Sequence, residues 1–186
     1  FIRFCNCNLN CSYCDTDFTS NKDYKEYDVI SLVNEVNKYN NIHSVSLTGG
    51  EPLLSIEFLK EFLPLINKKI YLEIKPYVDF VAADIKLESS TGQKYTFDIH
   101  EKFFDACRGV ETFAKIVFNQ NISDSEITKC CQLGIKYGIE LILQPQMLSD
   151  KLSVSSEFIL KIHERFLKEY SSVRVIPQVH KFINVR

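Results

Sequence analysis

Apolar residues recur along the chain in short runs that alternate with longer amphipathic stretches. The runs are rich in branched residues, and several are continuous rather than alternating, which is typical of strands covered on both faces. We expect strands in the following runs: "FIRF" (1–4), "HSVSLT" (43–48), "IYLEI" (70–74), "VDFVAADI" (78–85), "TFAKIVF" (112–118), "GIELILQP" (138–145) and "VRVIP" (173–177).

The stretches between these runs place apolar residues on one helical face. We expect helices in "DVISLVNEVNKY" (28–39), "SIEFLKEFLPLI" (55–66), "SDSEITKCCQLGIKYG" (123–138) and "SVSSEFILKIHERFLKEY" (153–170). The third has a capping residue at Ser123 or Asp124 and a stop at Gly138. Because strands and helices alternate, the sequence predicts an α/β protein with a mainly parallel sheet. We find no repeat or linker, so residues 1–186 are expected to form a single domain.

One junction departs from this pattern. Only "KPY" separates the run at 70–74 from the run at 78–85. Two consecutive parallel strands need a connection of about a dozen residues or more. Either this pair is antiparallel, or residues that belong between the two runs are missing from the chain.

Composition and charge narrow the function classes. The chain has 186 residues, of which 45% are hydrophobic and 25% charged, as in an ordinary soluble domain with a core. A net charge of −2 offers no basic field, so we expect no nucleic-acid partner. We also find no membrane-spanning apolar run and no signal-peptide pattern. The chain opens on "FIRF" without an initiator Met, so we expect the protein's true N-terminus to lie further upstream.

Cysteines cluster near the start of the chain. They are Cys5, Cys7, Cys11, Cys14, Cys107, Cys130 and Cys131. An odd, clustered set without secretion signals indicates a reducing compartment, hence the cytoplasm, and metal binding rather than disulfides. We expect Cys5 to be a small buried residue. The last three cysteines fall in helical context and are expected in the core.

The cluster contains the spacing C-x3-C-x2-C at Cys7, Cys11 and Cys14. A structural zinc site normally closes with four ligands, so three cysteines leave one position unfilled. An iron–sulfur cluster held by three thiolates instead leaves one iron open to bind another molecule. A zinc-binding module whose fourth ligand is Cys5 or a distant histidine remains the alternative.

A second motif, "TGGEP" (48–52), ends a predicted strand and precedes a predicted helix. In α/β sheets, ligands bind beyond the carboxyl ends of strands. Two glycines there let the backbone approach a ligand, and Glu51 could accept a hydrogen bond from an ammonium group. The alternative is a simple strand-to-helix turn with Pro52 at the first helical position.

Together these features resemble the radical S-adenosylmethionine (SAM) enzymes, which share C-x3-C-x2-C, an aromatic residue before the third cysteine (here Tyr13) and a GGEP-like stretch. The resemblance implies a [4Fe-4S] cluster on Cys7, Cys11 and Cys14. The fourth iron would bind the amino and carboxylate groups of SAM, and an electron from the cluster would split SAM to methionine and a 5′-deoxyadenosyl radical. The implied fold is a partial (β/α)6-type barrel that is open on one side.

The chain is further similar to the 7-carboxy-7-deazaguanine synthase family over nearly its whole length. The similarity rests on "FIRF", "CNLNCSYCDT" (7–16), "DIKLESS" (84–90), "LQPQ" (143–146) and "RVIPQVHKFINVR" (174–186). It implies a Mg²⁺-dependent ring contraction of 6-carboxy-5,6,7,8-tetrahydropterin with loss of ammonia, in 7-deazapurine and queuosine biosynthesis. It also implies a homodimer that takes electrons from an external donor.

The same resemblance assigns roles to individual residues. Substrate contacts would come from Arg3, Thr48 and His180, and Thr16 would bind Mg²⁺. Contacts with SAM and its cluster would come from Tyr13, Cys14, Asp15, Gly50, Glu51, Asp84, Lys86 and Gln144. The alternatives are structural: a solvated arginine, a capping hydroxyl, a buried strand threonine, a rim ion pair or a loop hydrogen bond.

Two further expectations follow from the family. Its members carry a segment before "FIRF" that helps to bind the substrate, and they continue from a stretch like "YLE" through a helix before the next strand. We therefore expect a missing segment, on the order of a dozen residues, between Glu73 and Ile74. Another enzyme class shares the cysteine loop and GGEP: an activase that makes a glycyl radical on a partner protein. That activase would need neither Mg²⁺ nor the "PQVHK" tail.

Overall fold

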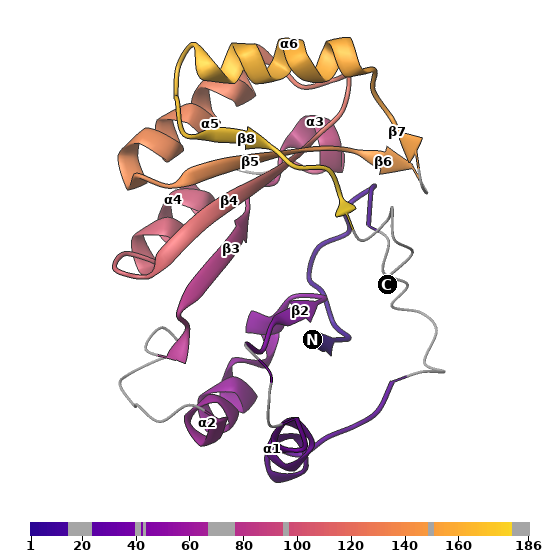
Figure 1. Cartoon of the computed structure of the whole chain (residues 1–186), viewed down its shortest axis with the longest axis vertical. Coiled ribbons are helices and arrows are strands. Elements are labelled where there is room, and N and C mark those ends of the chain that lie inside the picture. Colours follow the sequence, from indigo (N-terminus) through magenta and orange to yellow (C-terminus); the bar gives the residue numbers. More distant parts are fainter. Residues whose placement is uncertain are drawn as a thin grey trace. The chain divides into compact units, whose positions relative to one another are not determined.

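The computed structural model of the chain describes residues 1–14, 24–39, 42, 44–66, 77–94, 97–148 and 151–179. The chain divides into two compact units. Unit 1 comprises Phe1–Asn10 and Cys14–Asp79, and unit 2 comprises Cys11–Tyr13 and Phe80–Arg186. Figure 1 shows the elements of both units, coloured along the sequence.

Unit 1 is built on two short parallel strands, β1 (Ile2–Phe4) and β2 (Leu47–Gly49). Its helical elements are α1 (Val29–Asn37), the 3-10 helix η2 (Pro52–Ser55) and α2 (Ile56–Ile66). Alternate residues of a strand point to opposite faces, so one face of the pair carries Ile2, Phe4 and Leu47, which pack on the helical core. That core consists of Leu32, Leu59, Phe62 and Leu63.

Unit 2 contains a four-stranded parallel sheet in the order β3-β4-β5-β8 (Figure 1). The strands are β3 (Phe80–Asp84), β4 (Glu111–Phe118), β5 (Glu140–Pro145) and β8 (Val173–Val175). The helices are α3 (Glu88–Thr91), α4 (Phe97–Ala106), α5 (Asp124–Tyr137) and α6 (Ser156–Leu167). A small antiparallel pair, β6 (Met147–Leu148) and β7 (Lys151–Leu152), follows β5.

The two faces of this sheet differ in chemistry. The strand registers place one apolar set on a single face, where it joins the core with α4, α5 and α6; this set is Ala83, Ala114, Ile116, Phe118, Leu141, Leu143 and Val173. The opposite face retains buried Val117 and Ile142 but also carries Asp84, Lys115 and Gln144. Parallel sheets are usually apolar on both faces, so the polar residues on this face are unusual.

Most of the expected elements are observed, with adjusted ends. Helix α5 has the predicted cap at Ser123, whose hydroxyl accepts the Glu126 amide while the Glu126 carboxylate accepts the Ser123 amide, and it ends at Gly138 with φ of 64°. The prediction of an α/β protein with a mostly parallel sheet, as in a partial (β/α)6-type barrel, is confirmed. The strands described here form no closed barrel. The single-domain assignment for residues 1–186 stays a prediction.

Some elements were missed, and one lies outside the described part of the chain. Helix α4 was not predicted from the sequence, because its buried side carries the polar residue His100 as well as Phe104. Helix α6 starts at Ser156, later than the predicted 153, because Ser155 caps it. The predicted strand at 70–74 and the Glu73–Ile74 junction lie outside the described residues. None of the described helices has the length and apolar composition needed to span a membrane.

Candidate active site

The strand pair of unit 1 brings together two of the predicted substrate residues. Arg3 and Thr48 are register partners in β1 and β2, so their side chains start from the same face, the one opposite the apolar core. Arg3 is exposed and Thr48 half-buried. Gly49 has φ of 105°, and a Cβ atom there would lie 2.5 Å from Cγ of Arg3. The glycine therefore leaves room for the stem of the arginine.

The GGEP stretch is hydrogen-bonded to the residues that lead into the cysteine loop. The Gly50 amide donates to the Phe4 carbonyl at 2.8 Å, and the Glu51 amide donates to the Asn6 carbonyl at 2.7 Å. A Cβ atom on Gly50 would lie only 1.9 Å from the Asn6 carbonyl oxygen. The structure thus gives Gly50 a role that the sequence did not suggest: it allows the backbone next to Cys7 to pack against this turn.

Glu51 and Pro52 form the strand-to-helix turn that was the simpler alternative. Glu51 Oε1 accepts the Leu53 amide at 3.0 Å, and Pro52 is the first residue of η2. This cap engages one carboxylate oxygen. The expected bond between Glu51 and an ammonium group is compatible with the cap, because a carboxylate has a second oxygen that can accept it.

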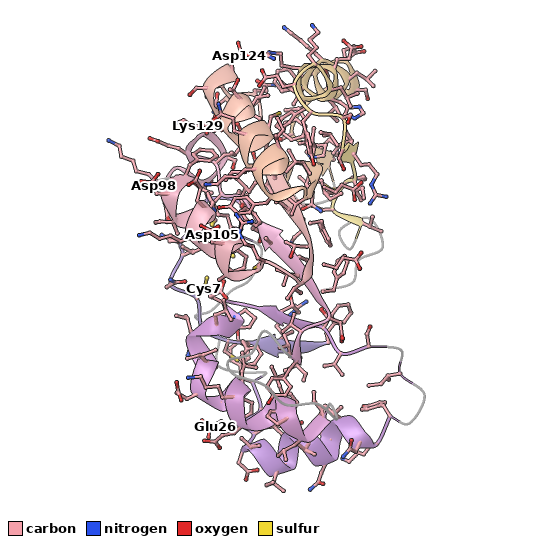
Figure 2. The ribbon with its side chains drawn as sticks, turned by 90° about the vertical axis from the view of Figure 1, so that its left-hand side faces the viewer. Cys7, Glu26, Asp98, Asp105, Asp124 and Lys129 are labelled. Atoms are coloured by element: carbon pink, nitrogen blue, oxygen red, sulfur yellow. The ribbon has the colours of Figure 1, made fainter. Side chains whose placement is uncertain are left out.

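In the cysteine loop, the sulfur of Cys7, which is labelled in Figure 2, accepts a backbone hydrogen bond. The Leu9 amide donates to Cys7 Sγ at 3.4 Å. Hydrogen bonds of this kind stabilise a thiolate and tune iron–sulfur clusters. Cys7 and Cys11 are half-buried and Cys14 is exposed. Cys5 was expected to be buried but is half-buried, because it lies just past the end of β1 rather than inside the core.

Among the described residues, no three His, Cys, Asp or Glu side chains converge on a single metal position. A single metal ion needs ligands that converge on one point. A cubane cluster is different, since each thiolate binds a different iron atom and the sulfur atoms stay apart. The cluster assignment to Cys7, Cys11 and Cys14 therefore rests on the motif and on the family.

The residues between the second and third cysteines are fixed within unit 2. Ser12 Oγ donates to the Ser90 carbonyl at 2.8 Å, and the Ser12 amide donates to the Thr91 carbonyl at 3.3 Å. Lys86 Nζ donates to Tyr13 Oη at 3.2 Å and lies 5.4 Å from the centre of the ring. Burial raises the pKa of Tyr13 to about 12, so the phenol stays protonated at neutral pH.

Asp84 and Lys86 form a charged group with a residue that the sequence analysis missed, Lys115. Asp84 Oδ2 lies 3.1 Å from Lys86 Nζ, and Asp84 Oδ1 lies 3.0 Å from Lys115 Nζ. Burial opposes ionisation of Asp84, but the two ammonium groups outweigh it and hold the pKa of the carboxyl below its usual range. Burial disfavours the charged form of Lys86 as well, yet Asp84 and Tyr13 raise the pKa of this lysine.

One feature of the sequence could have drawn attention to Lys115. It is the single charged residue inside the otherwise apolar run "TFAKIVF". The partner of Lys115 is known only from the strand register, which pairs it with Asp84 across β3 and β4. Gln144 lies on the same face, in β5, and is half-buried. The structure thus brings Asp84, Lys86, Lys115 and Gln144 to one side of the unit 2 sheet.

His100 supports this group from the core. Its Nε2 lies 3.4 Å from the Lys86 carbonyl oxygen, and its ring meets Phe97 edge-on at 5.7 Å. Burial lowers the pKa of His100, so the neutral ring is favoured. Three of the predicted site residues lie outside the described part of the chain: Asp15, Thr16 and His180. The Mg²⁺ role of Thr16, the Asp15 contact and the substrate role of His180 stay predictions.

Comparison with known proteins decides the family. Residues 1–114 match the family described as "Radical SAM superfamily". A 7-carboxy-7-deazaguanine synthase of Geobacter sulfurreducens is 31% identical over 98% of this chain and 88% of the relative. One from Archaeoglobus fulgidus is 32% identical over 100% of this chain and 89% of the relative. The chain belongs to the 7-carboxy-7-deazaguanine synthase family of the radical SAM superfamily.

Membership of this family has two consequences for the site. It implies a [4Fe-4S] cluster and SAM, and it favours the radical SAM reading over a zinc-binding module. It also bears on the unusual junction after Glu73. The Geobacter alignment runs over 220 positions, more than the 186 residues of this chain, so the relative has residues inside the aligned range that this chain lacks. The missing segment between Glu73 and Ile74 stays a prediction, because the positions of these extra residues are not fixed by the comparison.

Proposed function

We propose that the chain is a radical SAM lyase that converts 6-carboxy-5,6,7,8-tetrahydropterin to 7-carboxy-7-deazaguanine with loss of ammonia. The observation that carries the proposal is the relation to synthases of this name at 31% and 32% identity over nearly the whole chain. The geometry supports it, because Arg3 and Thr48 lie side by side and the GGEP turn is bonded to the approach to Cys7.

Cys7, Cys11 and Cys14 would hold the cluster, an assignment supported by their C-x3-C-x2-C spacing and by the family. Cys7 Sγ already accepts an amide hydrogen bond, as cluster thiolates do. When bound, the cluster supplies the electron that cleaves SAM. Glu51, Asp84, Lys86 and Gln144, with Gly50 and Tyr13, would bind SAM and its surroundings.

The chain's own residues perform binding and orientation. The Arg3 guanidinium would grip the substrate carboxylate through two parallel hydrogen bonds, a geometry that a lysine lacks. Thr48, its register partner, would fix a polar edge of the substrate. Asp84 is kept ionised by its two lysines, so it can accept hydrogen bonds from hydroxyl groups of SAM at neutral pH.

Several finer assignments belong to the same proposal. Thr16 would bind Mg²⁺, which prefers oxygen ligands and keeps several waters, with Asp15 close by in sequence. His180 would approach the substrate from the C-terminal tail. The enzyme would act as a homodimer in the cytoplasm, take electrons from an external donor, bind neither nucleic acid nor membrane, and serve 7-deazapurine synthesis.

The test is a reaction with defined components. Anaerobically purified protein should be brown and absorb near 400 nm, and incubation with the carboxypterin, SAM, reductant and Mg²⁺ should yield the deazaguanine and ammonia, measured by mass spectrometry. Omission of Mg²⁺ should slow the reaction. A colourless zinc protein, or a cluster-containing protein that leaves the pterin intact, would overturn the proposal.

A further inference from the structure

Helix α3 is short but firmly held within unit 2. Its residues Ser90 and Thr91 are each 2% exposed, and Leu87, which precedes the helix, is fully buried. Thr91 Oγ1 donates to the Leu87 carbonyl at 2.7 Å, which closes the single turn. Because these residues are buried, we expect the position of α3 within unit 2 to be well defined.

Residues at and just before the start of α5 hold α3 through the backbone of Ser89. The Glu126 carboxylate that caps α5 also accepts the Ser89 amide at 3.0 Å. Asn119 Nδ2 donates to the Ser89 carbonyl at 3.2 Å. Hydrogen bonds to a charged carboxylate are stronger than neutral ones. The position of α3 is therefore set by the capping carboxylate of a core helix.

The last carbonyls of a helix have no partner within the helix. In α3, two of these groups, those of Ser90 and Thr91, accept from Ser12, one from its hydroxyl at 2.8 Å and one from its amide at 3.3 Å. Ser12 directly follows Cys11. The next residue, Tyr13, is held by Lys86 Nζ at 3.2 Å. Cys11 is thus followed by two residues that are each fixed to unit 2.

We propose that Ser12 is a positioning residue for Cys11, and that it pre-forms this part of the cysteine loop for its iron before the cluster arrives. The inference rests on the proposed assignment of Cys11 as a cluster ligand. A thiolate that samples many positions in the apo protein loses more conformational entropy when it binds iron, so a fixed neighbour raises cluster affinity. The hydroxyl does not touch the reacting atoms and acts only through the backbone of Cys11.

The test compares three variants in the full chain. Ser12→Ala removes the hydroxyl bond, whereas Ser12→Thr retains the hydroxyl and places its extra methyl at an exposed position. Ser172→Ala is the matched control, since Ser172 is an exposed serine before β8. Each protein is reconstituted anaerobically, and the iron content, the rate of iron loss to a chelator and the EPR spectrum of the reduced cluster are measured.

We expect Ser12→Ala to lose iron about three to ten times faster than wild type, which corresponds to about 0.7–1.4 kcal/mol. Its reduced-cluster EPR spectrum should also be broadened, while the melting temperature of the apo protein stays close to that of Ser172→Ala. Ser12→Thr should restore wild-type behaviour. If Ser12→Ala lost iron at the wild-type rate and gave the wild-type EPR spectrum, the proposed role of Ser12 would be wrong, but the proposed function would still stand. A wild-type protein that takes up no cluster would overturn both this inference and the proposed function.

Discussion

Replacement of Gly50 by alanine tests how the GGEP turn supports the cysteine loop. The added Cβ would lie 1.9 Å from the carbonyl oxygen of Asn6 and 2.5 Å from its carbonyl carbon. Both contacts are with backbone, so no side chain can rotate away. The two segments would have to separate by roughly 1.5 Å to reach ordinary van der Waals distance.

The cost follows from the bonds that join these segments. A separation of that size breaks the 2.8 Å bond from Gly50 to Phe4 and the 2.7 Å bond from Glu51 to Asn6. Two lost hydrogen bonds cost about 1–3 kcal/mol together, and overpacking adds about 1–3 kcal/mol. Gly50 and Glu51 are only half-buried, so water replaces part of the lost bonding. We expect a loss of about 2–4 kcal/mol in the free energy of unfolding.

The assay combines urea denaturation with iron analysis and SAM binding. Gly138→Ala is the control, because Gly138 also has no side chain but a Cβ there would meet nothing within 4 Å. Its φ of +64° should cost about 1–2 kcal/mol and leave the cluster intact. Gly50→Ala should lose both stability and iron. If it instead kept full iron and stability and lost only SAM affinity, the glycine would serve the cofactor alone and the packing argument would be wrong.

Three further predictions concern charge. Arg3→Ala should raise the KM for the carboxypterin about 10- to 150-fold with SAM affinity unchanged, because a bidentate charge-assisted pair is lost; equal loss of SAM binding would contradict this. Lys115→Met should let the pKa of Asp84 rise, so SAM affinity, measured against pH, should begin to fall at a higher pH than in wild type as the solution is acidified; an unchanged profile would remove Lys115 from the site. Burial lowers the pKa of His100, so the unfolded chain binds the proton first and stability should drop as pH falls below about 6.5. His100→Gln should flatten that dependence in urea denaturation, and the same slope in both proteins would refute the assignment.

Sequence patterns were informative where a residue's environment is set by local periodicity. The parallel strands of both units and the four helices α1, α2, α5 and α6 follow from it, as does the cap of α5 at Ser123, whereas the short pair β6 and β7 was not predicted. Helix α4 was missed because His100 interrupts its apolar stripe; in the fold its ring nitrogen has the Lys86 carbonyl as a partner. A pattern of side-chain types does not record such a backbone partner.

Some residues of the candidate site were predicted from the sequence and others were not. The motif residues Cys7, Gly50 and Asp84 were found because the stretches around them resemble those of the radical SAM enzymes and of the synthase family. Lys115 and Ser12 were not, because the role of each depends on a partner far away along the chain: Asp84 across two strands, and the carbonyls at the end of α3. Strand register and helix termini belong to the fold, so these roles emerge only once the fold is known.

The charge of the site differs in sign from that of the chain. The protein carries a net charge of −2, which governs solubility and long-range attraction rather than local chemistry. On the polar face of the unit 2 sheet, one carboxylate, Asp84, is within 3.1 Å of one ammonium group and 3.0 Å of another. It neutralises only one of them, and Tyr13 stays a neutral phenol. This group of Asp84, Lys86, Lys115 and Tyr13 therefore retains one positive charge, although the chain as a whole is negative.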